Sequence, residues 1–177
     1  RSFENDKVYR FLHIPVQSGS NKVLNDMKRG HTAETYQNVV KEIRDKFTKF
    51  TISTDIIVGF PTETDSDFEK TVKLLEDTKP DIINLSRYSQ RPGTDAAELE
   101  QLEAKEIKRR SKIIADMADR YSLENNRGWI GWKGPVLFDE KIETGSIKGR
   151  NFAYKPIFVR DDDNVRIGDQ KSVEIID

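Results

Sequence analysis

The sequence has 177 residues, and its 30 Lys and Arg residues against 31 Asp and Glu residues leave a net charge of -1. This balance gives no overall attraction to nucleic acid or membranes, so any such binding must come from a local patch. No apolar run approaches the roughly 20 residues of a membrane span, and the absence of cysteine excludes a disulfide scaffold. We therefore expect a soluble, cytoplasmic protein. The opening, RSFENDKVYRFLHIPV, lacks Met and soon reaches an apolar segment, which suggests that the natural start lies upstream.

The first half of the sequence alternates short apolar runs with segments of helical spacing. Strands are expected at residues 11–16, 50–58 and 81–88, the first of them buried on both faces. Helices are expected between them, with Ser20, Thr32 and Thr64 as N-caps and Gly30 and Pro80 as stops. Because strands and helices alternate, the pattern predicts right-handed crossovers and a parallel sheet.

A long helix is expected at residues 104–126, where Ile107, Ile114, Met117 and Tyr121 form an apolar stripe. From Arg127 onward, short apolar runs alternate with glycines, a pattern typical of a small antiparallel barrel. The sequence therefore predicts two domains, at residues 1–126 and 127–177.

Polar loops follow the three expected strands, at residues 17–20, 59–63 and 89–94. Parallel α/β proteins bind ligands at this edge of the sheet. Asp55 lies inside the second strand, and a carboxylate there needs a partner or a water-lined cavity. It is either a structural ion-pairing residue or a contact for a polar ligand within a barrel, and we favour the second interpretation. His13 is expected to be a packed core histidine and His31 a surface loop residue.

The sequence lacks the motifs of self-sufficient catalysts. It contains no G-x-S-x-G elbow, no His pair at metal-binding spacing and no Walker loop. We assign no catalytic residue and no metal ligand, and Asp161, Asp162 and Asp163 are expected to form a solvated turn. The expected sheet is therefore a binding surface whose reactive component is missing from this chain.

Three ordered segments, FLHIPVQSGSNKVLNDMKRGHT, STDIIVGFPTETDSDFEKT and SRYSQRPGTDAA, followed by the expected barrel, resemble the radical S-adenosylmethionine methylthiotransferases. The resemblance covers essentially the whole chain. The ending NRGWIGWKG…GRNFAYKPIFV resembles the archaeal and eukaryotic branch, which is associated with methylthiolation of threonylcarbamoyladenosine next to the tRNA anticodon. The resemblance implies a fold in which the last part of a partial (β/α) barrel is followed by an OB-like TRAM domain that binds RNA.

The resemblance also implies what this chain lacks. Members of the family hold a [4Fe–4S] cluster on a Cys-x-x-x-Cys-x-x-Cys motif, which cleaves S-adenosylmethionine reductively, and a second cluster in a further N-terminal domain. This chain has no cysteine and would be a C-terminal part, inactive by itself, with the missing N-terminal domains as its partner.

The resemblance implies a set of cofactor contacts at the strand ends. Gln17 and Ser18 would hydrogen-bond polar parts of S-adenosylmethionine, and Ser53 and Asp55 would meet its ribose or amino-acid end. Gly59 would let the backbone approach the adenine, with Glu63 nearby at the rim. The third loop departs from the family pattern S-P-R-P-G-T, since Gln90 replaces Pro, and this puts the rigidity of that loop in doubt.

The C-terminal module combines basic and aromatic residues, which serve OB-like barrels on single-stranded RNA. The expected RNA-binding residues are Trp132, Lys133, Lys148, Arg150, Asn151, Phe152, Tyr154 and Lys155. Phe152 and Tyr154 are expected on the same face of one strand, so that both contact RNA or both pack in the core. With the family resemblance, the partner we expect is the anticodon stem-loop of tRNA.

The function that follows is that of part of an enzyme methylthiolating C2 of N6-threonylcarbamoyladenosine. One alternative is a related methylthiotransferase acting on isopentenyladenosine or on a ribosomal protein. The other is an RNA-binding protein without catalysis.

Overall fold

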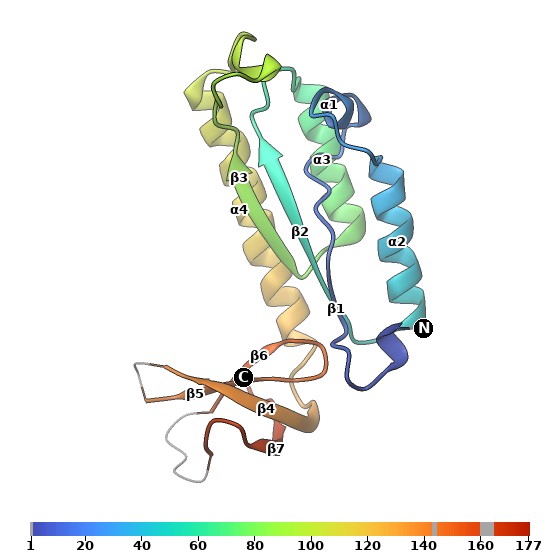
Figure 1. Cartoon of the computed structure of the whole chain (residues 1–177), viewed down its shortest axis with the longest axis vertical. Helices are drawn as coiled ribbons and strands as arrows, with labels where there is room; N and C mark the ends of the chain where they lie inside the picture. Colours follow the sequence, from blue (N-terminus) through green and yellow to red (C-terminus); the bar gives the residue numbers. More distant parts are fainter. Residues whose placement is uncertain (1, 143–144, 160–164) are drawn as a thin grey trace. The chain divides into compact units, whose positions relative to one another are not determined.

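The computed structural model describes residues 2–142, 145–159 and 165–177, which form two compact units (Figure 1). One unit consists of residues 12–48 and 52–123. The other contains residues 2–11, 49–51 and the described residues from 124 onward. No helix in the described ranges is long and apolar enough to cross a membrane.

The first unit is built on a parallel sheet of three strands in the order β1–β2–β3. The strands are β1 (Phe11–His13), β2 (Thr51–Val58) and β3 (Ile82–Arg87), and Asp55 of β2 pairs with Asn84 of β3. The helices are α1 (Asn21–Asp26), α2 (Ala33–Lys46), α3 (Asp65–Thr78) and α4 (Ala104–Arg127). This arrangement confirms the predicted parallel α/β architecture.

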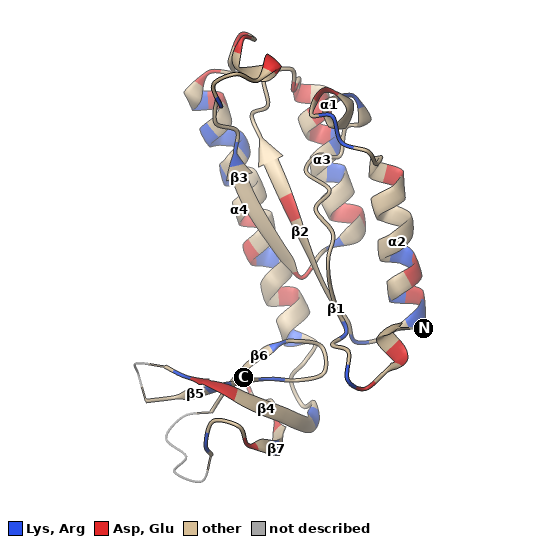
Figure 2. Cartoon of the chain, in the orientation of Figure 1, with Lys and Arg blue, Asp and Glu red and all other residues tan. Residues whose placement is uncertain are grey.

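Helices cover one face of this sheet and leave the other open (Figure 1). On the covered face, Ile52, Ile56 and Val58 of β2 are fully buried. The three strands of this sheet carry few charged residues, whereas the helices that cover it carry many (Figure 2). Because successive side chains of a strand alternate between faces, Ser53, Asp55 and Ile57 point to the open face.

The helix starts follow the expected capping chemistry at two of three positions. Thr32 accepts a hydrogen bond from the Thr35 N–H at the start of α2. Thr64 and Asp67 form a reciprocal capping box at the start of α3. Ser20 does occupy the N-cap of α1, but its hydroxyl donates to Asp67 Oδ1 at 2.6 Å and makes no cap bond.

Two expected boundaries are wrong. α1 ends at Asp26, well before Gly30, because Met27 is its C-cap and Lys28 has a φ of 58°. β1 ends at His13, and its residues are not buried on both faces. Pro15 follows closely and has no N–H to continue the ladder.

The helix α4 begins at Ala104 as expected and runs one residue past the expected end. Ile114, Met117 and Tyr121 of its apolar stripe are buried, but Ile107 is only half-buried. Arg110 lies in the first half of α4 and is also buried, with 3% of its surface exposed.

The second unit contains an antiparallel sheet of four strands in the order β6–β5–β4–β7. They are β4 (Lys133–Lys141), β5 (Ile147–Arg150), β6 (Pro156–Val159) and β7 (Gln170–Glu174). Its core is formed by Val136, Phe138, Ile157 and Val165. The opening segment belongs to this unit, because the Arg10 N–H donates to the Phe152 carbonyl at 2.8 Å.

One prediction about this sheet is wrong. Residues 151–155 form the turn between β5 and β6, so Phe152 and Tyr154 do not share the face of a strand. Tyr154 has a φ of 59°, in the left-handed region, and this breaks the alternation. The predicted turn at residues 161–163 lies outside the described residues.

Candidate functional site

Polar side chains from all three strands meet on the open face of the parallel sheet. His13 Nε2 donates to Asp55 Oδ1 at 2.8 Å, and Asn84 Nδ2 donates to the same oxygen at 2.9 Å. Ser53 lies two residues before Asp55, and Asn84 Nδ2 also lies 3.5 Å from the Ser53 hydroxyl. His13 is therefore a polar surface residue and not the packed core histidine that the sequence predicted, since 42% of its side chain is exposed.

The carboxylate of Asp55 is held charged at the centre of this group. Its partial burial works to raise its pKa, but hydrogen bonds from Asn84, His13 and Gln17 outweigh the burial and leave the pKa lowered. With 30% of its side chain exposed, the anion is within reach of a ligand. Such a charged acceptor binds hydroxyl or ammonium groups strongly.

Gln17 is fixed beside this group by its backbone. Its N–H donates to the Asp55 carbonyl at 2.8 Å, and its carbonyl accepts from the Ile57 N–H at 2.9 Å. These bonds hold Gln17 at a φ of 71°, which is uncommon for a residue other than glycine. The structure thus brings Gln17, Ser53 and Asp55 together.

Ser18 points away from the open face. Its hydroxyl lies 3.3 Å from the Thr71 hydroxyl on α3 and accepts from the Ser20 N–H at 3.1 Å. Gly19 packs so closely that an added Cβ would lie 2.4 Å from the Lys70 carbonyl oxygen. The loop at residues 17–20 is therefore seated on α3 through Ser18 and Gly19.

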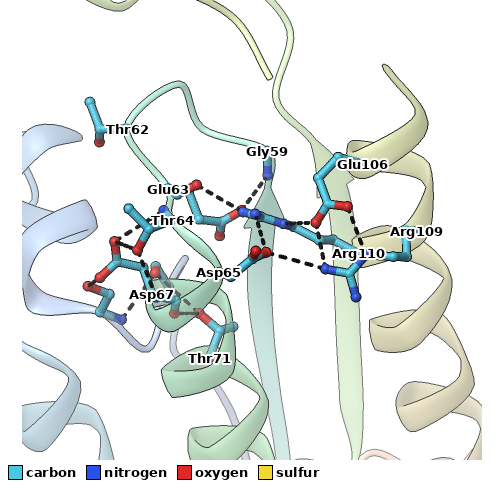
Figure 3. Close-up of polar contacts among 12 residues, drawn as sticks. Gly59, Thr62, Glu63, Thr64, Asp65, Asp67, Thr71, Glu106, Arg109 and Arg110 are labelled. Carbon is cyan, nitrogen blue, oxygen red and sulfur yellow. Dashed lines mark hydrogen bonds and ion pairs between the residues drawn. The ribbon is translucent and has the colours of Figure 1, made fainter. Parts of the chain in front are cut away.

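Gly59 and Glu63 also belong to a different contact network (Figure 3). The Glu63 side chain is fully buried, and its Oε2 accepts from the Gly59 N–H at 2.9 Å and from Arg110 at 2.7 Å. Burial raises the pKa of Glu63, and the bonds from Gly59 and Arg110 offset this only in part. Glu63 therefore lies in the interior and not at an exposed rim.

Gly59 approaches a helix, not an open space. Its φ is 79°, and an added Cβ would lie 2.7 Å from the Ile107 side chain of α4. The sequence analysis expected the backbone at Gly59 to approach the adenine of a ligand. In the structure it closely approaches α4 of this chain instead.

The loop after β3 is stabilised by its own short contacts. Thr94 donates to the Arg91 carbonyl at 2.8 Å, and Gly93 has a φ of 80°. Gln90, which stands where the family pattern has Pro, lies 3.5 Å from the Ala97 carbonyl. The hydroxyl and glycine of this loop therefore shape its turn.

In the second unit, several predicted RNA-binding residues serve the turn between β5 and β6. Asn151 is 1% exposed, and its side-chain oxygen accepts from the Ala153 and Lys155 N–H groups at 3.0 and 3.1 Å. Lys155 is 7% exposed and donates to Asn126 at 2.9 Å. Both side chains are held inside the unit.

The other basic residues of the predicted set are paired on the sheet. Lys133 contacts Glu174 at 2.9 Å with 69% of its side chain exposed. Lys148 is paired with Glu140. Arg150 lies 3.4 Å from Asp139 and also covers the Tyr154 ring, with its guanidinium carbon 4.2 Å from the ring centroid.

The aromatic residues form two groups. Trp132 and Phe152 pack with Trp129, with ring centroids 5.9 to 6.0 Å apart. Tyr154 packs edge-on against Tyr9, with ring centroids 5.0 Å apart. Tyr9 and Tyr154 are 40% and 37% exposed, whereas Trp129 is 5% exposed. The rings of Tyr9 and Tyr154, beside Arg150, are therefore the more accessible pair.

The sequence interpretation missed His13, Asn84, Arg110 and Tyr9. Asn84 could have been found, because it is the polar residue inside the apolar run DIINL, just as Asp55 is inside its own strand. The other three depend on contacts between distant segments. Within the described ranges, no group of three or more His, Cys, Asp or Glu residues could hold a metal ion.

Comparison with known proteins gives the family. The radical SAM superfamily model matches residues 4–75. A probable threonylcarbamoyladenosine tRNA methylthiotransferase of Archaeoglobus fulgidus is 45% identical over 156 residues, 88% of this chain and 37% of that protein. A Methanothermobacter thermautotrophicus protein with the same description is 41% identical over 156 residues, which are again 88% of this chain and 37% of that protein.

A bacterial relative carries a different substrate in its name. The tRNA-2-methylthio-N(6)-dimethylallyladenosine synthase of Ehrlichia ruminantium is 45% identical over 136 residues, 76% of this chain and 31% of that protein. The matches thus cover only 31% to 37% of the length of these relatives. By these matches it belongs to the radical SAM superfamily and, within it, to the methylthiotransferases.

Proposed function

We propose that the protein containing this chain methylthiolates C2 of N6-threonylcarbamoyladenosine next to the anticodon of tRNA. This chain supplies part of the S-adenosylmethionine pocket and part of the RNA-binding surface. The observation that carries the proposal is the 45% identity over 88% of the chain to an archaeal relative described by that activity. We assign residues 1–126 to the end of the partial barrel and 127–177 to the RNA-binding domain, although residues 2–11, 49–51 and 124–126 pack in the same unit as the latter.

The open face of the sheet fits S-adenosylmethionine. The exposed Asp55 carboxylate, flanked by His13 and Asn84, offers an acceptor for the ribose hydroxyls or the ammonium group of the cofactor. Ser53 and Gln17 border the same carboxylate. When bound, the cofactor supplies the methyl group and the radical chemistry, while these residues bind and orient it.

Ser18, Gly59 and Glu63 act in this site indirectly. Their polar groups are directed to α3 and to Arg110, so they hold the loops that border the pocket.

An iron–sulfur cluster does not fit the residues of this chain. Thiolates ligate such clusters, and none of the 177 residues is cysteine. The cluster ligands must come from the rest of the protein, and the chain alone is expected to be inactive.

The second unit is proposed to hold the RNA through Tyr9, Tyr154 and Arg150. Exposed rings stack on unpaired bases, and an arginine beside them contacts phosphate. Lys133 adds an exposed charge on β4. Lys155 and Asn151 support the turn that presents Tyr154.

The substrate has one specific alternative. The Ehrlichia ruminantium relative is named for dimethylallyladenosine and is also 45% identical, and a similarly named enzyme of Ectopseudomonas mendocina is 38% identical over 98% of this chain. The longer match at 45% identity favours the threonylcarbamoyl substrate. A ribosomal-protein substrate and a non-catalytic RNA-binding protein remain outcomes of the test.

The deciding experiment is mass spectrometry of tRNA nucleosides from cells with and without the full-length gene. Loss of 2-methylthio-N6-threonylcarbamoyladenosine, with accumulation of its unthiolated precursor, is expected. Loss of the dimethylallyl derivative instead would establish the alternative substrate. An unchanged nucleoside profile would contradict tRNA modification, and the ribosomal protein would be analysed next.

A further inference from the structure

Arg110 joins three parts of the first unit through a buried guanidinium group (Figure 3). Its Nη1 donates to the carbonyl and to Oε2 of Glu63, at 3.0 and 2.7 Å. Its Nη2 donates to Asp65 at 2.9 Å, and its Nε donates to Glu106 at 2.7 Å. The guanidinium also lies over the Phe68 ring, 5.4 Å from the centroid. One side chain of α4 thus contacts α3 and the loop before it.

The loop at residues 59–64 begins directly after β2, the strand that carries Asp55. Glu63 Oε2 accepts from both the Gly59 N–H and Arg110, so the start and the end of the loop meet at one oxygen. Because the Glu63 side chain is fully buried, removing Arg110 would leave its charge without a cationic partner. The loop would then have to rearrange, or the Glu63 carboxylate would have to take up a proton.

We propose that Arg110 is a positioning residue for the cofactor site, one that fixes the loop at residues 59–64 and so the end of β2 that carries Asp55. The inference rests on the proposed function, because it assigns the open face beside Asp55 to S-adenosylmethionine. The contacts of Arg110 with the described residues are to Glu63, Asp65, Glu106 and the Phe68 ring, so it acts on the open face indirectly, through Glu63 and Gly59. A buried ion pair is weak evidence for net stability, since its desolvation offsets much of its attraction. The Arg110–Glu63 pair is better explained by its effect on the loop at residues 59–64, which it holds in one conformation.

The neighbouring Arg109 provides a matched control. It shares two carboxylate partners with Arg110, Glu106 at 2.6 Å and Asp65 at 3.4 Å. However, 51% of its side chain is exposed, and its carboxylate partners among the described residues are Glu106 and Asp65 but not Glu63. Substituting Arg109 therefore removes a charge and two ion pairs without freeing the loop.

The test uses the full-length protein with Arg110→Met, Arg110→Lys or Arg109→Met. S-adenosylmethionine binding is measured by equilibrium dialysis, and hydrogen exchange is followed in the peptide that covers residues 56–66. Arg110→Met is expected to raise the dissociation constant at least tenfold and to increase exchange in this peptide. Arg110→Lys should recover part of the affinity, since it keeps a charge but loses the forked geometry. Arg109→Met should bind as the wild type does.

A second variant covers the case in which Arg110→Met does not fold. Replacing both partners, as Glu63→Leu with Arg110→Leu, removes the buried charges together and is tolerated better than breaking the pair. The double variant lacks the bond to the Gly59 N–H, so its cofactor affinity should still be at least tenfold lower.

The outcomes separate this inference from the proposed function. Affinity within twofold of the wild type in Arg110→Met, or in the double variant, would overturn the positioning role alone. A wild-type protein that does not bind S-adenosylmethionine would overturn the proposed function, and with it this role. A purely structural role of Arg110 would lower the free energy of unfolding while the folded protein keeps its affinity.

Discussion

The His13 imidazole and the Asp55 carboxylate are joined by a hydrogen bond of 2.8 Å between the neighbouring strands β1 and β2. Both side chains point to the face of the sheet that no helix covers. An imidazole bound to a carboxylate is fixed in one orientation, with Nε2–H donating to Asp55. The pair therefore presents a defined polar surface, which is what a small polar ligand requires.

Asp55→Asn should weaken S-adenosylmethionine binding to the full-length protein. The change keeps the shape of the side chain but removes the charge, and a hydrogen bond to a charged group contributes about 1.5–3 kcal/mol. The dissociation constant is expected to rise about tenfold or more in equilibrium dialysis. The free energy of unfolding should also fall, because the hydrogen bonds that lower the pKa of Asp55 stabilise the folded state, but the loss should be modest since 30% of the side chain is exposed and water screens its charge.

Asp45→Asn is the matched control, because this carboxylate lies on α2, pairs with Lys41 and is 65% exposed. It should bind the cofactor as the wild type does. Equal affinities in the Asp55 and Asp45 variants would remove Asp55 from the site.

Gly59→Ala should destabilise the protein more than Gly93→Ala. Both glycines have φ near 80°, so both variants lose about 1–2 kcal/mol through the left-handed backbone. At Gly93 nothing lies within 4 Å of the added Cβ, whereas at Gly59 it would meet the Ile107 side chain at 2.7 Å. Overpacking of this kind costs about 1–3 kcal/mol more. The free energy of unfolding of both variants is measured by urea unfolding.

Shortening Ile107 tests the cause of this difference. Ile107→Ala in the Gly59→Ala background should recover part of the lost stability, while the same change with Gly93→Ala should only add its own cost. If the two glycine variants unfold at the same urea concentration, the contact with Ile107 is not what requires glycine at position 59.

Glu106→Gln should reduce stability in a manner that depends on pH. Hydrogen bonds from Arg109 and Arg110 lower the pKa of Glu106 from 4.5 to about 2. A carboxyl group with a lowered pKa in the folded state contributes stability that is full above its unfolded value and is lost as the pH falls through the folded value. The difference in unfolding free energy between wild type and variant should therefore be constant above about pH 5 and shrink toward pH 2.

Urea unfolding at a series of pH values between 2 and 7 gives this difference directly. Glu100→Gln, at an exposed position in the loop before α4, is the control. A difference for Glu106→Gln that stays constant down to the lowest pH would contradict the ion pairs with Arg109 and Arg110.

Much of the fold could be predicted because its signals are local. The Thr64 and Asp67 capping box and the apolar stripe from Ile114 to Tyr121 can be read from spacing alone. The alternation of strands and helices likewise gave the parallel sheet. These features depend on residues within a few positions of each other.

The features that escaped prediction depend on contacts between distant segments. Arg110 lies in a helix whose buried stripe is otherwise mostly apolar, and its burial depends on carboxylate partners that include Glu63 and Asp65, far away in the sequence. The exposed position of His13 follows from the register of β1 against β2, which the sequence does not specify. Tyr154 adopts a positive φ that is uncommon for a tyrosine, so strand alternation gave the wrong orientation.

Replacing Tyr9 and Tyr154 with leucine should weaken binding of the full-length protein to an anticodon stem-loop. Stacking on an aromatic ring contributes about 1–3 kcal/mol per base, so losing these rings should reduce affinity about tenfold or more. The slope of affinity against salt concentration should not change, because no charge is removed. Arg150→Gln should instead reduce the magnitude of that slope by about 1, the value expected for the loss of one phosphate contact.

Phe158→Leu provides the control for the loss of an exposed ring. Phe158 lies on β6 of the same unit and is 56% exposed, but it belongs to neither aromatic group described above. Charge reversal at Lys155 is a poor probe, since its buried contact with Asn126 would be broken and the turn disturbed. If Phe158→Leu weakens RNA binding while the two tyrosine changes do not, the RNA contacts the β6 side of the sheet, and the Tyr9, Tyr154 and Arg150 surface is wrong.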